Sequence, residues 1–394
     1  MMEPLNFLRF QNVIDGKLVD SEKIRHGINP ATLEALPPVP LSTPKDVDAA
    51  VAAAKQAAQG WADTPLEDRQ QAVSRFADTL LEHIDGFARM LVLEQGKPLA
   101  FAKAEVESTV NILKGIAKLP FLEEVVEDTP DRRVITRYVP IGVSVGIVPW
   151  NFPLSLASFK LAPALVAGNP IILKPSPFTP YCGLKLAELG RNFFPAGVFQ
   201  VLSGDDNLGP WLTAHPGVDK VSFTGSTKTG IKVMQSCANT LKRVTLELGG
   251  NDPAIICANI DVPTVAAKVT SLALYNSGQV CIAIKRVYVH SDIYQKFLAE
   301  VTRHVNSLKM GNGLDDGVSI GPVQNALQFD RVKELMSSLE TENVKVLSGS
   351  VDAGSNEKGY FIEPVVIENP PDDSKIVTEE PFGMSYTEQT RLRS

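Results

Sequence analysis

The sequence has few of the residues that build metal centres and disulfide frameworks. Its 394 residues include four cysteines and five histidines. The cysteines lie far apart, with no C-x-x-C pair, and the histidines show no ligand spacing. We therefore expect no structural zinc site, no catalytic metal and no disulfide scaffold, a usage typical of a reducing compartment.

Long apolar runs and clusters of basic residues are also absent. No apolar run is long enough to span a bilayer. Residues 1–6 lack the basic region and apolar core of a signal peptide. The net charge is -7 at pH 7 without a Lys/Arg-rich run, so nucleic acid and membranes are not expected partners. These absences predict a cytoplasmic protein.

Helices dominate the first third of the chain after short extended pieces. Thr43 is a candidate N-cap, and Asp46 closes a capping box, which predicts a helix to about Gln59. The same Thr-Pro-x-acid pattern at Thr64 predicts a second helix that runs toward Glu94.

Short apolar segments then alternate with helical ones. The expected strands are residues 143–148, 170–173, 198–202, 221–223 and 244–246. Such alternation predicts an α/β fold with a Rossmann-like parallel sheet covered on both faces, whose ligands bind at the C-terminal ends of the strands. A second α/β stretch begins near Pro253.

Two loops carry residues suited to carbonyl chemistry. Cys281 follows a helical pattern that the turn formers Asn276, Ser277 and Gly278 end, so its thiol is a candidate nucleophile; an ordinary buried thiol is the alternative. Asn151 lies between two prolines after the first apolar strand, where its amide suits an oxyanion hole; a packed turn is the alternative.

Three further strand ends carry candidate groups. Gly225 and Ser226 lie where a strand enters a glycine turn and a helix begins, a place that suits phosphate. Lys174 follows another strand and can reach ribose or phosphate oxygens, or else is a solvated surface lysine. Glu247 precedes two glycines in an apolar strand. Burial would raise its pKa toward neutrality and suit a general base; the alternative is a glutamate that points to water.

These motifs, in this order and spacing, closely resemble the aldehyde dehydrogenase superfamily. The resemblance rests on residues 149–153, 223–226, 246–250 and 278–281, with support from residues 159–165, 195–198, 321–322, 359–364 and 379–383. It runs from about Asn12 to Gly383. It implies the aldehyde dehydrogenase fold and oxidation of an aldehyde to a carboxylic acid with NAD(P)⁺, through a thiohemiacetal and a thioester.

The resemblance also assigns roles to single residues. Catalysis would use Cys281 as the nucleophile, Asn151 for the oxyanion and Glu247 as the base. Cofactor binding would use Trp150, Lys174, Ser176, Gly225, Ser226, Gly230, Glu380 and Phe382. Lys160 matches a position linked to proton exit. NAD is the expected cofactor, although Pro177 stands where NAD-preferring members often carry a glutamate, so NADP use is left open.

The resemblance divides the chain as follows: residues 1–125 and 141–249 for the cofactor-binding domain, 126–140 for an oligomerisation-type strand segment, 250–383 for the catalytic domain and 384–394 for an atypical tail. The polar tail replaces a longer family segment and looks like an altered reading frame. We expect its lack to leave strand edges and core positions uncovered. Oligomeric state is left open, because the family's assembly strand lies in that segment.

Two other functions compete with this interpretation. Residues 142–146 satisfy G-x-S-x-G, which would make Ser144 the nucleophile of a serine hydrolase if a helix followed it directly. The other alternative is a catalytically impaired relative of the aldehyde dehydrogenases that binds only nucleotide or a partner. The aldehyde is not specified, although Phe152, Leu156 and Ile282 indicate a nonpolar one.

Overall fold

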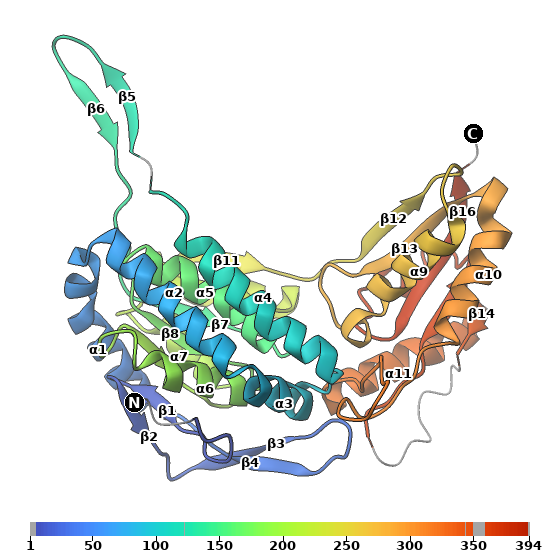
Figure 1. Ribbon diagram of the computed structural model, residues 1–394, viewed down its shortest axis with the longest axis horizontal. Coiled ribbons are helices and arrows are strands. Elements are labelled where there is room, and N and C mark those ends of the chain that lie inside the picture. The colour runs from blue at the N-terminus through green and yellow to red at the C-terminus, as the bar shows by residue number, and fades with distance from the viewer. Residues whose placement is uncertain (1–4, 122, 343, 350–358, 393–394) are drawn as a thin grey trace. The chain divides into compact units, whose positions relative to one another are not determined.

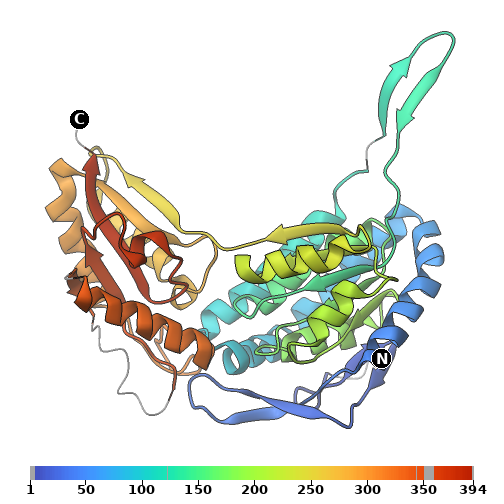
Figure 2. The ribbon, with the colours of Figure 1, turned by 180° about the vertical axis from the view of Figure 1, so that it is seen from behind.

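The computed structural model describes residues 5–121, 123–342, 344–349 and 359–392 (Figure 1, Figure 2). Residues 1–4 of the expected first domain and 393–394 of the tail lie outside these ranges. The chain divides into two compact units. Unit 1 comprises Met1–Gly27, Pro37–Ala88 and Lys103–Glu247, and unit 2 comprises Ile28–Leu36, Arg89–Ala102 and Leu248–Ser394.

Unit 1 is built on a seven-stranded sheet in the order β11-β10-β7-β8-β9-β1-β2. Five strands are parallel, which confirms the predicted parallel sheet: β7 (Ser144–Ile147), β8 (Ile171–Lys174), β9 (Phe199–Val201), β10 (Lys220–Thr224) and β11 (Arg243–Glu247). At the other end of the sheet, β1 (Asn12–Ile14) and β2 (Lys17–Val19) run antiparallel. The strand order reverses between β7 and β10, and ligands bind at such reversals in open α/β sheets.

Helices cover this sheet in the expected alternation. Contacts to the sheet come from α1 (Pro44–Asp63), α5 (Pro153–Val166), α6 (Tyr181–Gly190), α7 (Leu208–Ala214) and α8 (Thr227–Ala238), while α2 (Leu66–Glu82) packs on α5 and α6. Helices α3 (Ile84–Gln95) and α4 (Leu99–Ala117) and the paired strands β3 (Ile24–Ile28) and β4 (Ala35–Pro40) contain residues of both units.

The helix starts test local sequence rules. Thr43 caps α1 with the predicted capping box, complete in both directions. The second predicted cap is wrong, because Thr64 is the C-cap of α1, and α2 begins after Pro65 with no side-chain cap. Helix α1 runs past Gly60 because Trp61 is buried and its indole Nε1 donates to the Leu165 carbonyl at 3.0 Å.

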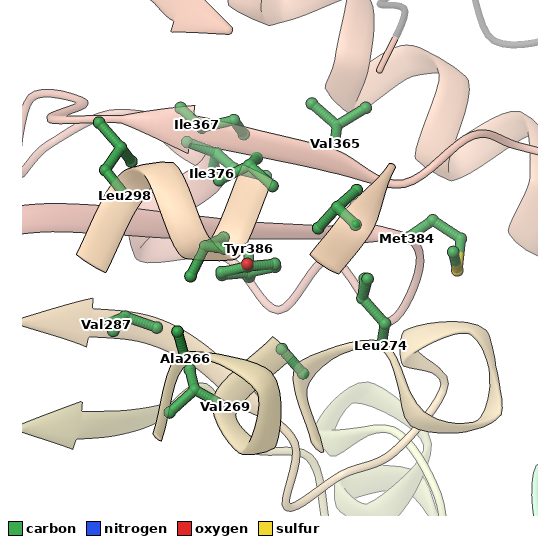
Figure 3. Close-up of a cluster of buried hydrophobic side chains, with 14 of the residues drawn as sticks. Ala266, Val269, Leu274, Val287, Leu298, Val365, Ile367, Ile376, Met384 and Tyr386 are labelled. Carbon is green, nitrogen blue, oxygen red and sulfur yellow. The ribbon is translucent and has the colours of Figure 1, made fainter. Parts of the chain in front are cut away.

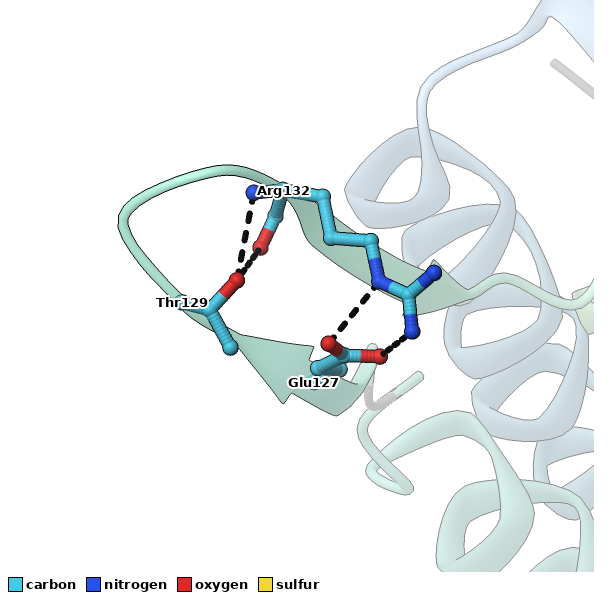
Figure 4. A network of polar contacts seen from close by, with 3 residues as sticks. All are labelled: Glu127, Thr129 and Arg132. Atoms are coloured by element: carbon cyan, nitrogen blue, oxygen red, sulfur yellow. Dashed lines mark hydrogen bonds and ion pairs between the residues drawn. The ribbon is translucent and has the colours of Figure 1, made fainter.

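Residues 126–140 include much of a two-stranded hairpin, β5 (Glu124–Asp128) with β6 (Arg133–Thr136). At its turn the Arg132 guanidinium donates to both carboxylate oxygens of Glu127, at 2.8 and 2.6 Å (Figure 4). The Thr129 hydroxyl bonds the Arg132 backbone at 3.2 Å in both directions. These contacts are exposed to solvent, so they define the turn more than they stabilise the chain.

Unit 2 has a five-stranded sheet in the order β12-β13-β16-β15-β14. Its strands are β12 (Asp252–Ile256), β13 (Ile284–His290), β14 (Lys345–Ser348), β15 (Val365–Glu368) and β16 (Ser385–Leu392), of which only β14 runs antiparallel to its neighbour. Its helices are α9 (Val262–Ala273), α10 (Tyr294–Val305), α11 (Ala326–Thr341) and α12 (Lys375–Thr378), with 3-10 turns at Tyr275–Gly278 and Ser291–Ile293.

The tail forms β16, a central strand of this sheet. Met384 and Tyr386 are buried in the apolar core beside Val365 and Leu274 (Figure 3). The expectation that the tail leaves strand edges and core positions uncovered is therefore wrong for β13 and β15. The physical reason is that main-chain pairing does not depend on side chains, while Met384 and Tyr386 supply the apolar groups that the core requires.

Candidate active site

Unit 1 gathers the cofactor-side candidates at the C-terminal ends of neighbouring strands. In the order β8, β7, β10, β11, these ends carry Lys174, the Trp150–Asn151 loop, the Gly225–Ser226 turn and Glu247. The register aligns Ile147 with both Lys174 and Phe223, so the strands end nearly level. Sequence alone predicted each strand end, and the strand order brings them to one edge of the sheet.

The Asn151 loop is held by the helix that follows it. Asn151 is 2% exposed, and Pro153 begins α5. The buried Glu105 carboxylate accepts from the first N–H groups of this helix, Leu154 at 2.9 Å and Ser155 at 3.3 Å. Such groups have no partner within a helix, and a carboxylate there also interacts favourably with the helix dipole.

Glu105 is not among the residues predicted from the sequence. Its signal is a carboxylate on the apolar stripe of α4, beside Ala102, Val106 and Val110, where solvent does not reach it. A buried charge on such a stripe requires partners in the fold.

Lys174 and Ser176 follow β8, and both are buried. Burial lowers the pKa of Lys174 to about 8, and Asp206 opposes that change. The Lys174 ammonium donates to the Pro175 carbonyl at 3.4 Å, and the Ser176 hydroxyl accepts from the Phe178 N–H at 3.2 Å. The interpretation of Lys174 as a solvated surface lysine is therefore wrong.

Ser226 is the N-cap of α8, and its hydroxyl accepts from the Thr229 N–H at 3.3 Å. Gly225 donates to the Glu247 carbonyl at 3.0 Å, and a Cβ at Gly225 would lie 2.6 Å from the Phe223 ring. The Gly230 N–H donates within the helix to the Ser226 carbonyl, so Gly230 offers no free donor to a phosphate. The turn and the first helical N–H groups keep the geometry of an anion site.

Glu247 differs from its expected burial. It ends β11, the edge strand of the sheet, and its side chain is exposed. Only one neighbouring strand covers it, which explains why an apolar strand sequence did not bury it. Glu247 acts electrostatically on Lys160, whose ammonium donates to the Thr224 hydroxyl at 2.7 Å. Burial lowers the pKa of Lys160 to about 8, and the Glu247 carboxylate opposes that change.

Unit 2 holds Cys281 behind a strained turn. Asn276, Ser277 and Gly278 all have positive φ, at 51°, 58° and 71°. For the two residues that are not glycine, this conformation costs on the order of 1 kcal/mol each and persists only where neighbours enforce it. A turn that is held in this way fixes the direction in which the chain reaches Cys281.

The enforcing contacts come from the side chains of Ser277 and Gln279. The Ser277 hydroxyl donates to the Gly321 carbonyl at 2.8 Å. The Gln279 amide donates to the Asn276 carbonyl at 2.9 Å and accepts from the Gln324 N–H at 2.9 Å. Sequence reasoning identified the turn but not Gln279 or Gln324, because these two residues bond each other across 45 residues of chain.

The Cys281 thiol is partly exposed, in contrast to Cys182 and Cys237, which are buried. Burial raises its pKa above the ordinary value, the nearby backbone N–H groups of Cys281 and Ile282 oppose that change, and Glu380 and Asp252 add to it. The resting side chain is therefore a thiol at neutral pH, and attack requires transfer of its proton.

Glu380 and the Gly249–Gly250 pair lie together in unit 2. The Glu380 carboxylate accepts from the Gly250 N–H at 3.3 Å. A Cβ at Gly249 would lie 2.1 Å from the other carboxylate oxygen, so any larger residue there would displace the Glu380 carboxylate. Burial raises the pKa of Glu380, while Gly250, Arg331 and Lys285 lower it.

Phe382, near Glu380, has a positive φ of 48°. The Gln328 amide bridges the carbonyls of Pro381 and Phe382 at 3.1 Å each, which fixes this loop. The structure thus places Cys281, Glu380 and Phe382 in unit 2, and the other candidate residues in unit 1.

Ser144 lacks the setting of a hydrolase nucleophile. It is the first residue of β7, is buried, and donates its N–H to the Pro170 carbonyl. The strand continues after it, and the next helix begins only at Pro153. A nucleophile elbow needs a helix directly after the serine, so this alternative is wrong.

In the described part of the chain, no group of three or more His, Cys, Asp or Glu side chains could hold a metal ion. None of the helices in those residues is both long and apolar enough to cross a membrane.

Comparison with known proteins gives matches over nearly the whole chain. The model of the aldehyde dehydrogenase family matches residues 18–384. The chain is 38% identical over 380 residues to the putative aldehyde dehydrogenase FUS7 of Gibberella fujikuroi, covering 96% of this chain and 80% of the relative. It is 35% identical over 385 residues to the succinate-semialdehyde dehydrogenase [NADP(+)] GabD of Escherichia coli, with 96% and 80% covered.

Solved structures agree with this assignment. The NAD⁺ complex of an aldehyde dehydrogenase from Bacillus cereus superposes with a TM-score of 0.94 at 33% identity, covering 98% of this chain and 81% of the other. The predicted aldehyde dehydrogenase fold is confirmed. The chain belongs to the aldehyde dehydrogenase family.

Proposed function

We propose that this chain oxidises an aldehyde to the carboxylic acid with NAD⁺ or NADP⁺, and that Cys281 is the nucleophile. The observation that carries the proposal is the enforced left-handed turn of residues 276–278, which delivers a partly exposed thiol. A structural cysteine needs no such strain, whereas strained backbone gathers at functional sites.

The residues present fit a nicotinamide dinucleotide. Lys174 and Ser176 supply buried polar groups at the end of β8, and the start of α8 supplies free N–H groups beside Ser226. The Glu380 carboxylate, approached closely by Gly249 and Gly250, suits the two hydroxyls of a ribose. When bound, the dinucleotide accepts the hydride that the oxidation releases.

The covalent steps belong to the chain's own residues. The Cys281 thiol gives its proton to solvent water, and its sulfur attacks the carbonyl carbon. The C–S bond forms while the carbonyl π electrons move to oxygen, and the amide of Asn151 donates to that oxyanion. Loss of hydride from the same carbon leaves a thioester on Cys281. Glu247 takes a proton from a water molecule, and the resulting hydroxide attacks the thioester. The C–S bond breaks with its electron pair on sulfur, which gives the acid and a Cys281 thiolate, and the proton held by Glu247 returns the thiolate to the thiol. The exposure of Glu247 leaves it accessible to that water.

The proposal is tested by the absorbance of the reduced nicotinamide with a panel of aldehydes and both dinucleotides. Cys281→Ser should abolish turnover, and Cys257→Ser is the matched control, because Cys257 is an exposed thiol of the same unit. A folded wild-type chain without turnover, or turnover that persists in Cys281→Ser, would contradict the proposal. The panel also tests whether apolar aldehydes are preferred, as Phe152, Leu156 and Ile282 indicate.

A further inference from the structure

A buried lysine joins the two loops of unit 2 that carry candidate site residues. Lys285, on β13, is 1% exposed. Its ammonium donates to the Gly278 carbonyl at 2.9 Å and to the Gly383 carbonyl at 3.0 Å. One acceptor lies three residues before Cys281 and the other three residues after Glu380, so a single side chain holds both loops.

The two loops pack closely at this point. Gly278 has a φ of 71°, and a Cβ there would lie 2.0 Å from the Gly383 carbonyl oxygen and 2.8 Å from the Lys285 nitrogen. The two loops therefore touch through their backbones, and the lysine bonds both where they meet. A lysine is a costly residue to bury, because its charged form loses hydration.

The chemistry of the amine explains why lysine suits this place. Burial lowers the pKa of Lys285 to about 7, and Glu380 opposes that change. An ammonium has three donors, and a neutral amine keeps two, which is the number of carbonyls that it serves. Both hydrogen bonds can therefore be made in either protonation state, and the connection does not depend on pH.

We propose that Lys285 is a positioning residue that couples the nucleophile loop at Cys281 to the Glu380 loop. Its two hydrogen bonds fix the turn that aims the thiol, and they fix the loop that presents the Glu380 carboxylate. A shift of one loop therefore shifts the other loop as well. Only the expected effect on turnover rests on the proposed function. The positions of the two loops do not depend on it.

The test compares Lys285→Met, which keeps the apolar stem but has no donor, with Lys285→Gln, which keeps two N–H donors without charge. The matched control is Lys185→Met. Lys185 is another lysine at 1% exposure, but it belongs to α6 in unit 1, where it pairs with Glu188. Each full-length variant is first checked for folding by a thermal melt.

The first readout is the rate at which iodoacetamide alkylates Cys281, followed by mass spectrometry of the peptide that carries it. In Lys285→Met the released loop should expose the thiol, and the rate should rise by about threefold or more, because exposure and thiolate fraction both increase. This readout needs no turnover, so it tests the inference even if the proposed function fails.

The second readout is steady-state kinetics. In Lys285→Met, kcat should fall by about tenfold or more, because a misplaced nucleophile loses its reacting geometry. The KM for the dinucleotide should rise in the same variant. Lys285→Gln should recover part of each change, and Lys185→Met should show none in its folded fraction. If Lys285→Met does not fold, Lys285→Gln is compared with Lys185→Met instead, and it should show smaller changes of the same sign in the alkylation rate, kcat and KM.

Three results would overturn the assignment. The first is that folded Lys285→Met has the alkylation rate and the dinucleotide KM of the wild type. If only Lys285→Gln folds, the same result in that variant overturns the assignment. Another is the same change in Lys185→Met, which would indicate a general effect of losing a buried lysine. The third is no recovery in Lys285→Gln, which would assign the effect to charge rather than to the two hydrogen bonds.

Discussion

Replacing Glu388 by glutamine should remove a pH-dependent loss of stability. Glu388 is fully buried on the central strand β16, and neither carboxylate oxygen has a hydrogen-bond partner among the described residues. The strand register places it directly beside Glu368 of β15, which pairs with Lys345. Burial raises the pKa of Glu388 from 4.5 to about 8, and Glu368 adds to that change.

The sign and size follow from proton linkage. Between pH 4.5 and about 8 the folded chain holds a proton on Glu388 that the unfolded chain releases, so stability falls as pH rises through this window. The pKa of Glu388 differs by about 3.5 between the folded and unfolded chain, and each pKa unit corresponds to about 1.4 kcal/mol. The upper limit on the stability that Glu388 loses is therefore ~5 kcal/mol. Below pH 4.5 the contribution of Glu388 is complete, and above pH 8 it is lost.

The assay is urea unfolding of the wild type, Glu388→Gln and the control Glu379→Gln at about pH 5, 7 and 9, values that span the window. Glu379 is an exposed carboxylate of the same unit. Glu388→Gln should gain stability relative to the wild type as pH rises, by several kcal/mol, and Glu379→Gln should not. Parallel pH profiles for the wild type and Glu388→Gln would refute the reasoning.

Three further changes have expected outcomes. Gly249→Ala should raise the KM for the dinucleotide several-fold, because the new Cβ would lie 2.1 Å from a Glu380 carboxylate oxygen; Gly60→Ala, with nothing within 4 Å of its new Cβ, is the control, and an unchanged KM in Gly249→Ala would contradict the role of Glu380. Tyr181→Phe should lower the free energy of unfolding by ~1–3 kcal/mol in a denaturant titration, because its buried hydroxyl accepts from the Gly27 N–H and donates to the Pro37 carbonyl at 2.7 Å each, and no loss would refute this. Glu105→Ala should cost ~1–3 kcal/mol in the same titration and lower kcat more than it changes KM, since two buried N–H groups lose an acceptor; an unchanged kcat would separate Glu105 from the Asn151 loop.

Local features of the fold could be predicted from the sequence. The capping box at Thr43 depends on residues within one turn, and it is confirmed in full. The parallel strands of unit 1 also follow their predicted segments, because a strand that is buried on both faces reads as an apolar run.

Features set by distant contacts could not be predicted. Helix α1 passes through Gly60 because Trp61 packs and bonds far along the chain. The polar tail becomes a central strand because two neighbouring strands offer main-chain partners, which no local pattern announces. Glu247 is exposed because β11 lies at the edge of its sheet, and strand order is not a local property.

The candidate site divides in the same way. Asn151, Cys281 and the Gly225–Ser226 turn are visible as residue types at turns beside strands and helices. The groups that hold them, Glu105, Gln279 and Lys285, lie on other elements or face the interior, and only the fold shows what they bond. The sequence therefore predicts the candidate reacting groups, and the structure shows the contacts that hold their loops.

The central claim is that Cys281 carries the acyl group during turnover. The most direct measurement is mass spectrometry of the acid-quenched Glu247→Gln variant after mixing with an aldehyde and the dinucleotide, since removal of the base should slow hydrolysis of the thioester. The account predicts an acyl mass on the peptide that carries Cys281 and none on the peptide with Cys257. Product formation at the wild-type rate without this adduct, or an adduct on another residue, would contradict it.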